Sequence, residues 1–383
     1  MPDHLFPCDA CGAQLAFAPG ETSLVCPSCG HVQEIAAGDA GEVAEALRER
    51  DYTEVIASLQ RDAASEETRS VRCPNCGAQT EFPEGTQAAT CPFCATPLVA
   101  ADAGSRRQIR PAAVIPFQLT EERARAAMSD WLGSLWLAPN GLREYARKGR
   151  RLDGIYVPYW TFDADTSTTY RGRRGDAYYE SQTVVRNGQR QTVQVRRVRW
   201  QGVRGRVARR FDDVLVLASR SLPKAYTDAL EPWDLQALTP FRPAYLAGLK
   251  AEGYTVELDE AFAQAQGIMA AQIEGDIRAD IGGDEQQVTS RDTDLRDVRF
   301  KHVLLPVWMA AYRYGDRSFR FVVNGQTGRV QGERPWSRWK VAGAVLLALV
   351  LALLLLYAYG LTQEGGPPAR PGGLGDGPSW LNE

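Results

Sequence analysis

The eight cysteines are the residues of this 383-residue chain whose spacing most clearly points to chemistry. All of them precede residue 95, and they form four Cys-x-x-Cys pairs with none left over. Two residues between the cysteines let one tight turn present both sulfurs to one ion, and four thiolates complete a closed tetrahedral zinc site. We predict two structural zinc ions, one held by Cys8, Cys11, Cys26 and Cys29 and one held by Cys73, Cys76, Cys91 and Cys94.

The second set of cysteines repeats the first. Both sets have the spacing Cys-x2-Cys-x14-Cys-x2-Cys, and each cysteine of the second set lies 65 positions after its counterpart. The repeat extends to Gly-Ala-Gln after Cys11 and Cys76, which indicates an internal duplication. A thioredoxin-like motif would occur once and near a βαβ pattern. His31 follows Cys29 closely, but the complete quartets disfavour it as a ligand.

Each four-cysteine segment, which we call a ribbon, spans only 22 residues from its first cysteine to its last. This is too short for a hydrophobic core, so we expect metal binding to supply most of the folding free energy. We assign the ribbons to residues 1–36 and 70–104, joined by a helical spacer at 37–69 whose residues 39–62 have a helical pattern. The opening sequence MPDHLFPCDA lacks the features of a signal peptide, which favours reduced, metal-bound thiols over disulfides.

Charge is divided unevenly along the chain. Residues 1–104 carry sixteen acids and five bases, a formal charge of −11, whereas residues 105–383 carry +8. Binding of DNA or RNA depends mainly on Lys and Arg side chains that neutralise phosphates. We therefore expect the ribbons to bind protein rather than nucleic acid.

An uncharged, proline-free run of nineteen residues, VAGAVLLALVLALLLLYAY, lies at positions 341–359. As a helix it would be about 28 Å long, close to the ~30 Å hydrocarbon core of a bilayer; a buried core helix is the alternative. Four bases shortly precede the run and one follows it, so the positive-inside rule places the N-terminal side in the cytoplasm. We predict a single-pass cell-membrane protein, with a transmembrane helix and basic flank at 334–360 and a disordered tail at 361–383.

Residues 105–333 are predicted to form a mixed α/β domain, because helix and strand patterns alternate along this region. The helix at 259–281 is the clearest, since its apolar residues recur on one face. The expected elements are helices at 121–132, 141–149 and 259–281, strands at 155–160, 193–200, 214–218 and 303–308, and a hairpin at 319–330.

Residues 171–210 hold twelve arginines but only two acids, Asp176 and Glu180. Strand-like residues flank Asn187-Gly188, a pair typical of tight hairpin turns, so we expect an extended hairpin. An ordinary solvated strand pair is one interpretation. Contact with anionic lipid headgroups, with the acidic ribbons or with nucleic acid are the others, although the segment has only three aromatic residues for stacking on bases.

The chain contains no recognisable catalytic constellation. It has three histidines, of which His302 lies at the start of an apolar strand and is expected to be structural. The pair Asp284-Glu285 resembles the acidic pair of ATPases, but its context IGGDEQQ is typical of a turn. Neither G-x4-G-K-[ST] nor G-x-S-x-G occurs. We predict no enzymatic activity and no catalytic residues.

The duplicated cysteine sets and several further segments resemble a bacterial family of membrane-anchored double zinc-ribbon proteins. Its members carry the labels TFIIB-type zinc ribbon protein and primosomal protein N′ (replication factor Y) superfamily II helicase. The resemblance implies zinc at all eight cysteines, a membrane anchor and, in some relatives, association with flotillin-like and phage-shock-type membrane stress proteins. The helicase label does not fit this chain, because no motor motif is present. The segments are WLAPNGLREYAR (136–147), GIYVPYWTFDA (154–164), FDDVLVLAS (211–219), ADIGGDEQ (279–286), FKHVLLPVW (300–308) and VNGQTGRVQGERPWS (323–337).

The sequence thus predicts an α+β protein with two small zinc ribbons, a mixed α/β middle region and one C-terminal transmembrane helix. The leading functional hypothesis is a non-enzymatic scaffold or adaptor that docks cytoplasmic or membrane-associated protein partners in a membrane-stress or flotillin-linked system. The main alternative is a nucleic-acid-associated accessory factor that binds through residues 171–210. An enzyme with an unrecognised site is the third and least favoured hypothesis.

Overall fold

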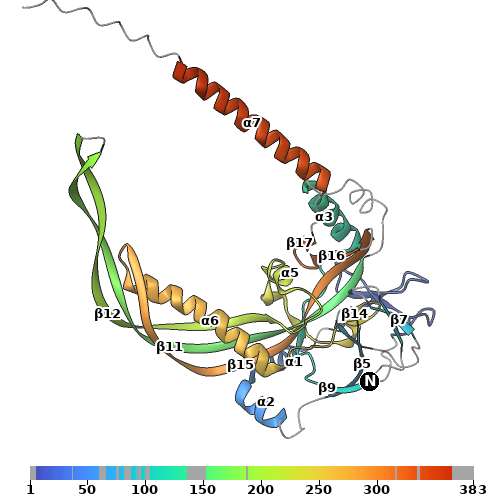
Figure 1. The fold of residues 1–383 in the computed structure, drawn as a ribbon. Helices are drawn as coiled ribbons and strands as arrows, with labels where there is room; N and C mark the ends of the chain where they lie inside the picture. The colour runs from blue at the N-terminus through green and yellow to red at the C-terminus, as the bar shows by residue number, and fades with distance from the viewer. Residues whose placement is uncertain are drawn as a thin grey trace, which may run out of the picture.

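The computed structural model describes residues 6–36, 38–59, 66–74, 77–81, 88–91, 93, 96–99, 104–135, 152–186, 189–314, 317–333 and 337–364. They form a mixed α/β fold that consists mostly of sheet (Figure 1). Three strands are far longer than the usual strand of about five or six residues. They are β11 (Asp153–Arg186), β12 (Gln189–Leu217) and β15 (Glu285–Tyr314).

These long strands are neighbours in a nine-stranded sheet with the order β12-β11-β15-β10-β13, in which β12 lies at the edge. The runs expected as strands at 155–160 and 303–308 are neighbours in it, with Tyr156 opposite Pro306 in an antiparallel pair. β10 runs parallel to β15, and β14 runs parallel to β11. The shorter strands of the sheet are β4 (Arg50–Asp51), β10 (Ala113–Val114), β13 (Thr239–Pro240), β14 (Lys250–Ala251), β16 (Arg317–Asn324) and β17 (Val330–Gly332).

The central part of the sheet is buried on both faces. Side chains alternate between the faces of a strand, so adjacent residues enter separate cores. Tyr156 and Leu304 belong to one core, and Ile155 and Leu305 belong to the core on the opposite face. The first core is also covered by α3 (Glu121–Ser134), the helix expected at 121–132. Shorter helical elements lie at α5 (Lys224–Asp228), η2 (Leu235–Ala237) and η3 (Pro243–Leu246).

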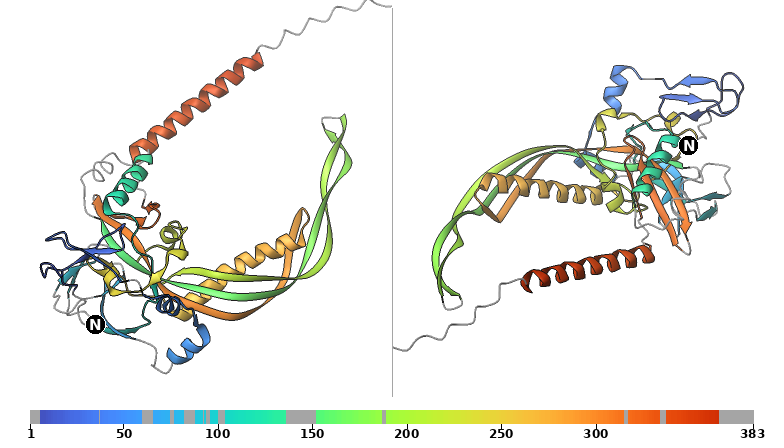
Figure 2. Two further views of the ribbon diagram at one scale, coloured as in Figure 1. Left: turned by 180° about the vertical axis from the view of Figure 1, so that it is seen from behind. Right: turned by 90° about the horizontal axis from the view of Figure 1, so that it is seen from above.

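Away from this centre, β12, β11 and β15 continue together as a curved projection, which we call the arm (residues 165–186, 189–210 and 285–296; Figures 1 and 2). Its root contains a β-bulge on each side of β11, around residues 162–165. Asp213 and Asp297 lie at these irregularities with φ values of 52° and 48°. Because bulges bend and twist strands, they account for curvature at the root of the arm.

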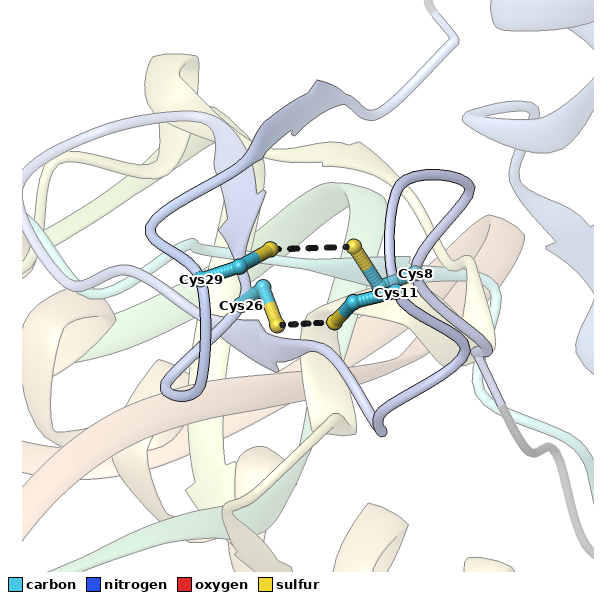
Figure 3. Close-up of side chains that lie close together, drawn as sticks. All are labelled: Cys8, Cys11, Cys26 and Cys29. Carbon is cyan, nitrogen blue, oxygen red and sulfur yellow. Dashed lines mark hydrogen bonds between the residues drawn. The ribbon is translucent and has the colours of Figure 1, made fainter.

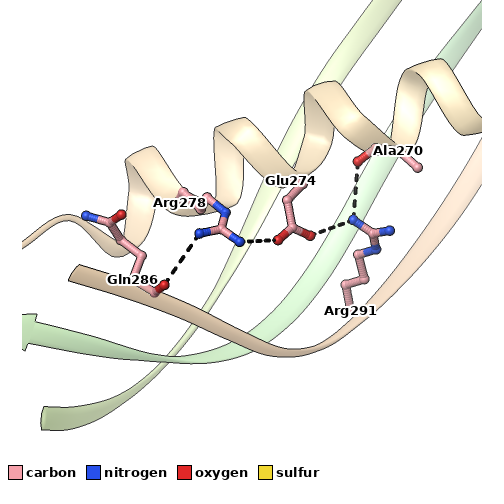
Figure 4. A network of polar contacts seen from close by, with 5 residues as sticks. All are labelled: Ala270, Glu274, Arg278, Gln286 and Arg291. Carbon is pink, nitrogen blue, oxygen red and sulfur yellow. Dashed lines mark hydrogen bonds and ion pairs between the residues drawn. The ribbon is translucent and has the colours of Figure 1, made fainter.

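The helix α6 (Leu258–Ile281) lies along one face of the arm, at the position expected from the sequence. Met269, Ile273, Ile277 and Ile281 recur about once per helical turn and are all buried against the strands. Polar contacts fix the helix at its margins, as Figure 4 shows for Glu274, which accepts hydrogen bonds from Arg278 (2.9 Å) and from Arg291 of β15 (2.7 Å).

The last part of the arm consists of two strands only. Gly175 pairs with Glu285, the first residue of β15, and beyond this point β11 and β12 pair only with each other. We call residues 176–186 and 189–199 the tip ribbon. The hairpin expected from the arginine-rich sequence is therefore present, whereas its Asn187-Gly188 turn lies outside the described residues.

The N-terminal region contains small sheets and a spacer. The single helical pattern expected at 39–62 is instead divided into α1 (Ala40–Ala46) and α2 (Tyr52–Leu59), because β4 between them pairs with β15. The first ribbon has strands β1 (Ala16–Phe17), β2 (Ser23–Val25) and β3 (Val32–Glu34). The second region has β5 (Glu66–Arg72), β6 (Gln79–Glu81), β7 (Ala88–Thr90), β8 (Pro97–Val99) and β9 (Gly104–Gln108).

The C-terminal apolar run is a helix, α7 (Arg338–Glu364). Its segment Trp339–Tyr359 contains an 18-residue stretch with a mean hydropathy of 2.8 and no residue buried against the rest of the protein. By length and composition this helix could cross a membrane. The helix expected at 141–149 and most of the tail expected at 361–383 fall on residues that the structure does not describe.

Candidate metal centre

The first four cysteines are held by two matching turns. In one, the N–H of Cys8 donates to the carbonyl of Ala13 (2.7 Å) and the N–H of Gly12 donates to the carbonyl of Cys8 (2.8 Å). The turn at Cys26 has the same two bonds: the N–H of Cys26 donates to the carbonyl of His31, and the N–H of Gly30 donates to the carbonyl of Cys26. Gly12 and Gly30 have φ values of 75° and 72°, which a residue with a side chain adopts only with strain. The glycines thus allow each Cys-x-x-Cys pair to curl around one point.

These turns bring all four sulfurs together (Figure 3). The Sγ atoms of Cys8, Cys11, Cys26 and Cys29 lie within 4.8 Å of one another. The distance from Cys8 to Cys29 is 3.6 Å, and that from Cys11 to Cys26 is 3.5 Å. Four sulfurs at ~2.3 Å from one zinc ion would be separated by about 3.8 Å. The donor set and its spacing therefore fit one tetrahedral metal ion, with every ligand position taken by protein.

The electrostatics of the cluster also favour a cation. The backbone N–H of Cys29 lowers the pKa of the Cys26 thiol to about 6. For Cys29, the N–H of His31 favours the thiolate, but the sulfurs of Cys11 and Cys26 outweigh it and raise the pKa to about 12. Adjacent thiolates repel one another, so all four can be deprotonated at neutral pH only when a cation lies between them.

The first ribbon is mounted on the central sheet. Cys8, Cys26 and Phe17 are buried in the same core as Tyr156 of β11 and Leu304 of β15. The N–H of Phe17 donates to the carbonyl of Ala247 (2.9 Å), which fixes β1 against the body. The ribbon therefore shares a hydrophobic interior that its own 22 residues could not form.

Half of the second cysteine set is described, and it repeats the geometry of the first. The N–H of Cys73 donates to Ala78 (2.8 Å) and that of Cys91 donates to Thr96 (2.8 Å), the same five-residue spacing as in the first ribbon. Gly77 has φ 76°. Cys73 and Cys91 are buried, whereas Cys76 and Cys94 lie outside the described residues.

The second region packs on the face of the sheet opposite to the first ribbon. Cys73, Cys91 and Phe93 share a core with Ile155 and Leu305, on the other side of β11 and β15 from the core that holds Cys8 and Cys26. The two cysteine-bearing regions thus enclose the sheet between them at the root of the arm.

A buried charge network at the bulges was not anticipated from the sequence. Lys301 donates to Glu49 of the spacer (3.2 Å) and pairs with Asp213 (2.9 Å). Burial and a hydrogen bond shared with Glu49 raise the pKa of Asp163 to about 7. Glu49, Asp163 and Asp212 lie close enough together to hold a cation, but the ammonium of Lys301 already lies beside Glu49. The network anchors the spacer to the sheet.

The residues considered for catalysis in the sequence make contacts that support the fold. His302 is 4% exposed, and its Nδ1 lies 2.8 Å from the carbonyl of Ile109, with Trp160 and Tyr254 around the ring. Asp284 accepts a hydrogen bond from the N–H of Ala177 (2.7 Å), and Glu285 pairs with Arg196. Both acids are thus engaged in holding β15 to the hairpin.

Comparison with known proteins finds a curated relative whose sequence is similar enough to this chain to support a family assignment. The chain is 31% identical over 259 residues to "Uncharacterized protein YdjG" of Bacillus subtilis (strain 168). The alignment covers 65% of this chain and 72% of that protein. No protein-family model matches the chain, and no solved structure matches it.

Proposed function

The chain belongs to the family of the Bacillus subtilis protein YdjG, and from its own features we propose that it is a membrane-anchored zinc-ribbon scaffold that docks protein partners. The observation that carries the proposal is the closed cluster of four cysteine sulfurs mounted on the central sheet. A metal site with four protein ligands has no open position for substrate or water, and such sites stabilise structure rather than catalyse reactions.

We assign zinc to this cluster and a second structural zinc to Cys73, Cys76, Cys91 and Cys94. Four thiolates in a tetrahedral arrangement select zinc or an iron–sulfur centre, and the knuckle spacing is that of zinc ribbons. For the second site, support comes from the repeated sequence and from the repeated hydrogen bonds of Cys73, Gly77 and Cys91.

The helix α7 is assigned as the membrane anchor. Its leucines are exposed, for example Leu355 at 72%, which is unfavourable in water and favourable in lipid. Arg329, Arg334, Arg338 and Lys340 precede the span, so the body of the protein lies on the cytoplasmic side. Protease added to right-side-out vesicles is expected to leave the ribbons intact, and their digestion would reverse this orientation.

The nucleic-acid alternative is favoured by the twelve arginines of residues 171–210. Two observations weigh against it. Residues 1–104 carry −11, and two of the three aromatic rings of residues 171–210 have an arginine of the same chain over one face. Arg173 lies over Trp200 and Arg199 over Tyr178, each with the guanidinium carbon 5.4 Å from the ring centroid, so one face of each ring is already occupied and less of it is available to stack on bases.

Affinity purification of the full chain from membranes tests the proposal. The scaffold hypothesis predicts that defined proteins co-purify, that nuclease treatment leaves them bound, and that a Cys8→Ser/Cys26→Ser variant loses those that need the first ribbon. The family resemblance makes flotillin-like and phage-shock-type proteins the first partners to look for. Recovery of partners only through nuclease-sensitive contacts would instead support the accessory-factor hypothesis.

A further inference from the structure

The outer edge of β12 is an extended basic surface. β12 is the terminal strand of the sheet and pairs only with β11 among the described residues. Its residues 189–210 contain eight arginines and no acid. We infer that this edge binds an acidic, extended polypeptide segment, which adds to the sheet as a further strand. The inference rests on the proposed scaffold function and deepens it by naming a docking surface and the chemistry of its partner.

The arm neutralises only part of this charge by itself. Arg190, Arg204 and Arg210 make no ion pair within the described part of the chain, and Arg204 lies directly opposite Arg171. Like charges opposite each other across strands destabilise a sheet, and carboxylates from a partner would remove this repulsion. The other arginines of the strand that have acidic partners are Arg196 with Glu285, Arg197 with Glu180 and Arg209 with Asp276.

The placement of the arginines favours a strand over a flat surface. Alternate residues point to opposite faces, so Arg204, Arg206 and Arg210 lie on one face of β12 and Arg209 lies on the other, where it contacts α6. Only the edge gives access to both rows. A membrane surface lying against the sheet would meet one row, whereas a strand added along the edge would bring its own alternate side chains to both.

An added strand would stabilise the tip ribbon more than any other part of the arm. A two-stranded hairpin alone is marginally stable in water, yet the tip ribbon has no third strand or covering helix among the described elements. Tyr179 and Val185 are 68% and 70% exposed there. A partner strand would supply main-chain hydrogen bonds along the outer edge of β12. Over residues 189–210 this edge is about 70 Å long.

Among the described residues, no acid of residues 1–104 makes an ion pair with an arginine of the tip ribbon. The first ribbon lies at the root of the arm, at the opposite end of the molecule from the tip ribbon (Figures 1 and 2). The only ion pairs to acids outside β11 and β12 that the arginines of residues 189–210 make in the described structure involve α6 and β15. Since no described acid of residues 1–104 pairs with these arginines, we assign the complementary charge to another molecule.

The test uses the full chain in phosphatidylcholine nanodiscs and a labelled peptide of about twelve residues that alternates Glu and Val. We expect salt-sensitive binding by fluorescence anisotropy, together with slower amide hydrogen exchange at alternate residues of 189–210. A peptide of the same charge with proline at alternate positions cannot complete the hydrogen-bond ladder. It is expected to bind at least about tenfold more weakly and to give no protection.

Charge-reversal variants supply the matched control. Arg190→Glu/Arg204→Glu should weaken peptide binding by about tenfold or more. It should also fold, because a carboxylate at position 204 would face Arg171 as an opposite charge. Arg123→Glu/Lys224→Glu changes the net charge equally at exposed positions away from the arm and should bind as the unaltered chain does.

Three outcomes would overturn the inference. If both peptides bound equally and neither slowed amide exchange at residues 189–210, the edge would attract acidic peptides only by non-specific electrostatics. Protection of residues 189–210 by phosphatidylglycerol nanodiscs in place of the peptide would assign the edge to lipid. Binding of a single-stranded oligonucleotide but not of the peptide would assign it to nucleic acid. If the Arg190/Arg204 variant retains its partners in membrane purification, the scaffold function stands and only this docking surface is wrong.

Discussion

At the scale of single residues, the cysteines and the glycines beside them determine where this protein could bind a metal ion. Cys-x-x-Cys spacing and the following glycine suffice to predict a knuckle from sequence, because both act within five residues of the chain. The network of Lys301 with Glu49 and Asp213 could not be predicted in this way, since its members come from positions far apart in the chain. The only sequence signal was a lysine beside an otherwise apolar run.

Metal content follows directly from the cysteines. The unaltered chain is expected to contain two zinc ions, and Cys26→Ser or Cys91→Ser to contain one, because three thiolates bind zinc far more weakly than four. Native mass spectrometry or elemental analysis measures this. His31→Ala is the control and should retain two ions. Two bound zinc ions in Cys91→Ser would contradict the second site.

The buried imidazole of His302 predicts a pH dependence. Burial lowers its pKa to about 4, whereas an unfolded histidine titrates near 6.5. Between these values the unfolded chain binds the proton and the folded chain does not, so stability falls as the pH is lowered from about 6.5 to about 4. The full effect is about 3 kcal/mol.

Denaturant unfolding at several pH values checks this effect. His302→Asn, whose amide Nδ2 takes the place of Nδ1 and can still donate to the carbonyl of Ile109, should lack it. Other titrating groups, such as Asp163, contribute equally to both proteins and cancel in the difference between them. Identical pH profiles for the two proteins would show that His302 does not titrate as proposed.

At the scale of secondary-structure elements, local periodicity was a good guide to helices and a poor one to strand length. The pattern over 259–281 gave α6 almost to the residue, because a helix is built from neighbours in sequence. The strands were recognised only in fragments. β11 extends over 34 residues because its partners β12 and β15 continue beside it, and pairing with β15 joins residues more than a hundred positions apart. Another long-range pairing, that of β4 with β15, interrupts the expected spacer helix.

The packing of α6 on the arm can be tested by a cavity. Ile277 is fully buried between the helix and the strands. Ile277→Ala should reduce the free energy of unfolding by about 2–5 kcal/mol. Hydrogen exchange should increase in α6 and the adjoining strands. Gln272→Ala, on the exposed side of the same helix, should change stability by less than about 0.5 kcal/mol. Equal effects of the two substitutions would mean that this helix does not pack as described.

For the whole molecule, the main finding is that the two cysteine-bearing regions pack on opposite faces of one sheet. The sequence predicted that metal binding supplies most of the folding free energy of each ribbon, because 22 residues are too few for a hydrophobic core. In the folded protein they share two cores with β11 and β15. No local sequence pattern could have indicated this arrangement. It depends on which face of the sheet the side chains of Ile155 and Tyr156 point to, and on which ribbon packs against that face.

Chelation should therefore have a graded effect. A zinc chelator is expected to increase amide exchange in residues 6–36 and 66–99, because the knuckles lose their central ion. The central parts of β11 and β15 should remain protected by their ladder and by the core residues of the sheet itself. Exchange mass spectrometry with and without chelator measures both regions at once. Simultaneous loss of protection everywhere would mean that the ribbons hold the sheet together.

The order of these parts along the chain has a consequence for biosynthesis. All eight cysteines leave the ribosome before any residue of β11, β12 or β15 does. A newly made ribbon therefore has no sheet to pack against, and during that interval only a bound metal ion can keep it folded. The apolar helix α7 emerges after the strands on which the ribbons pack have been made. We therefore expect zinc depletion to harm this chain most during its translation, before the sheet has formed.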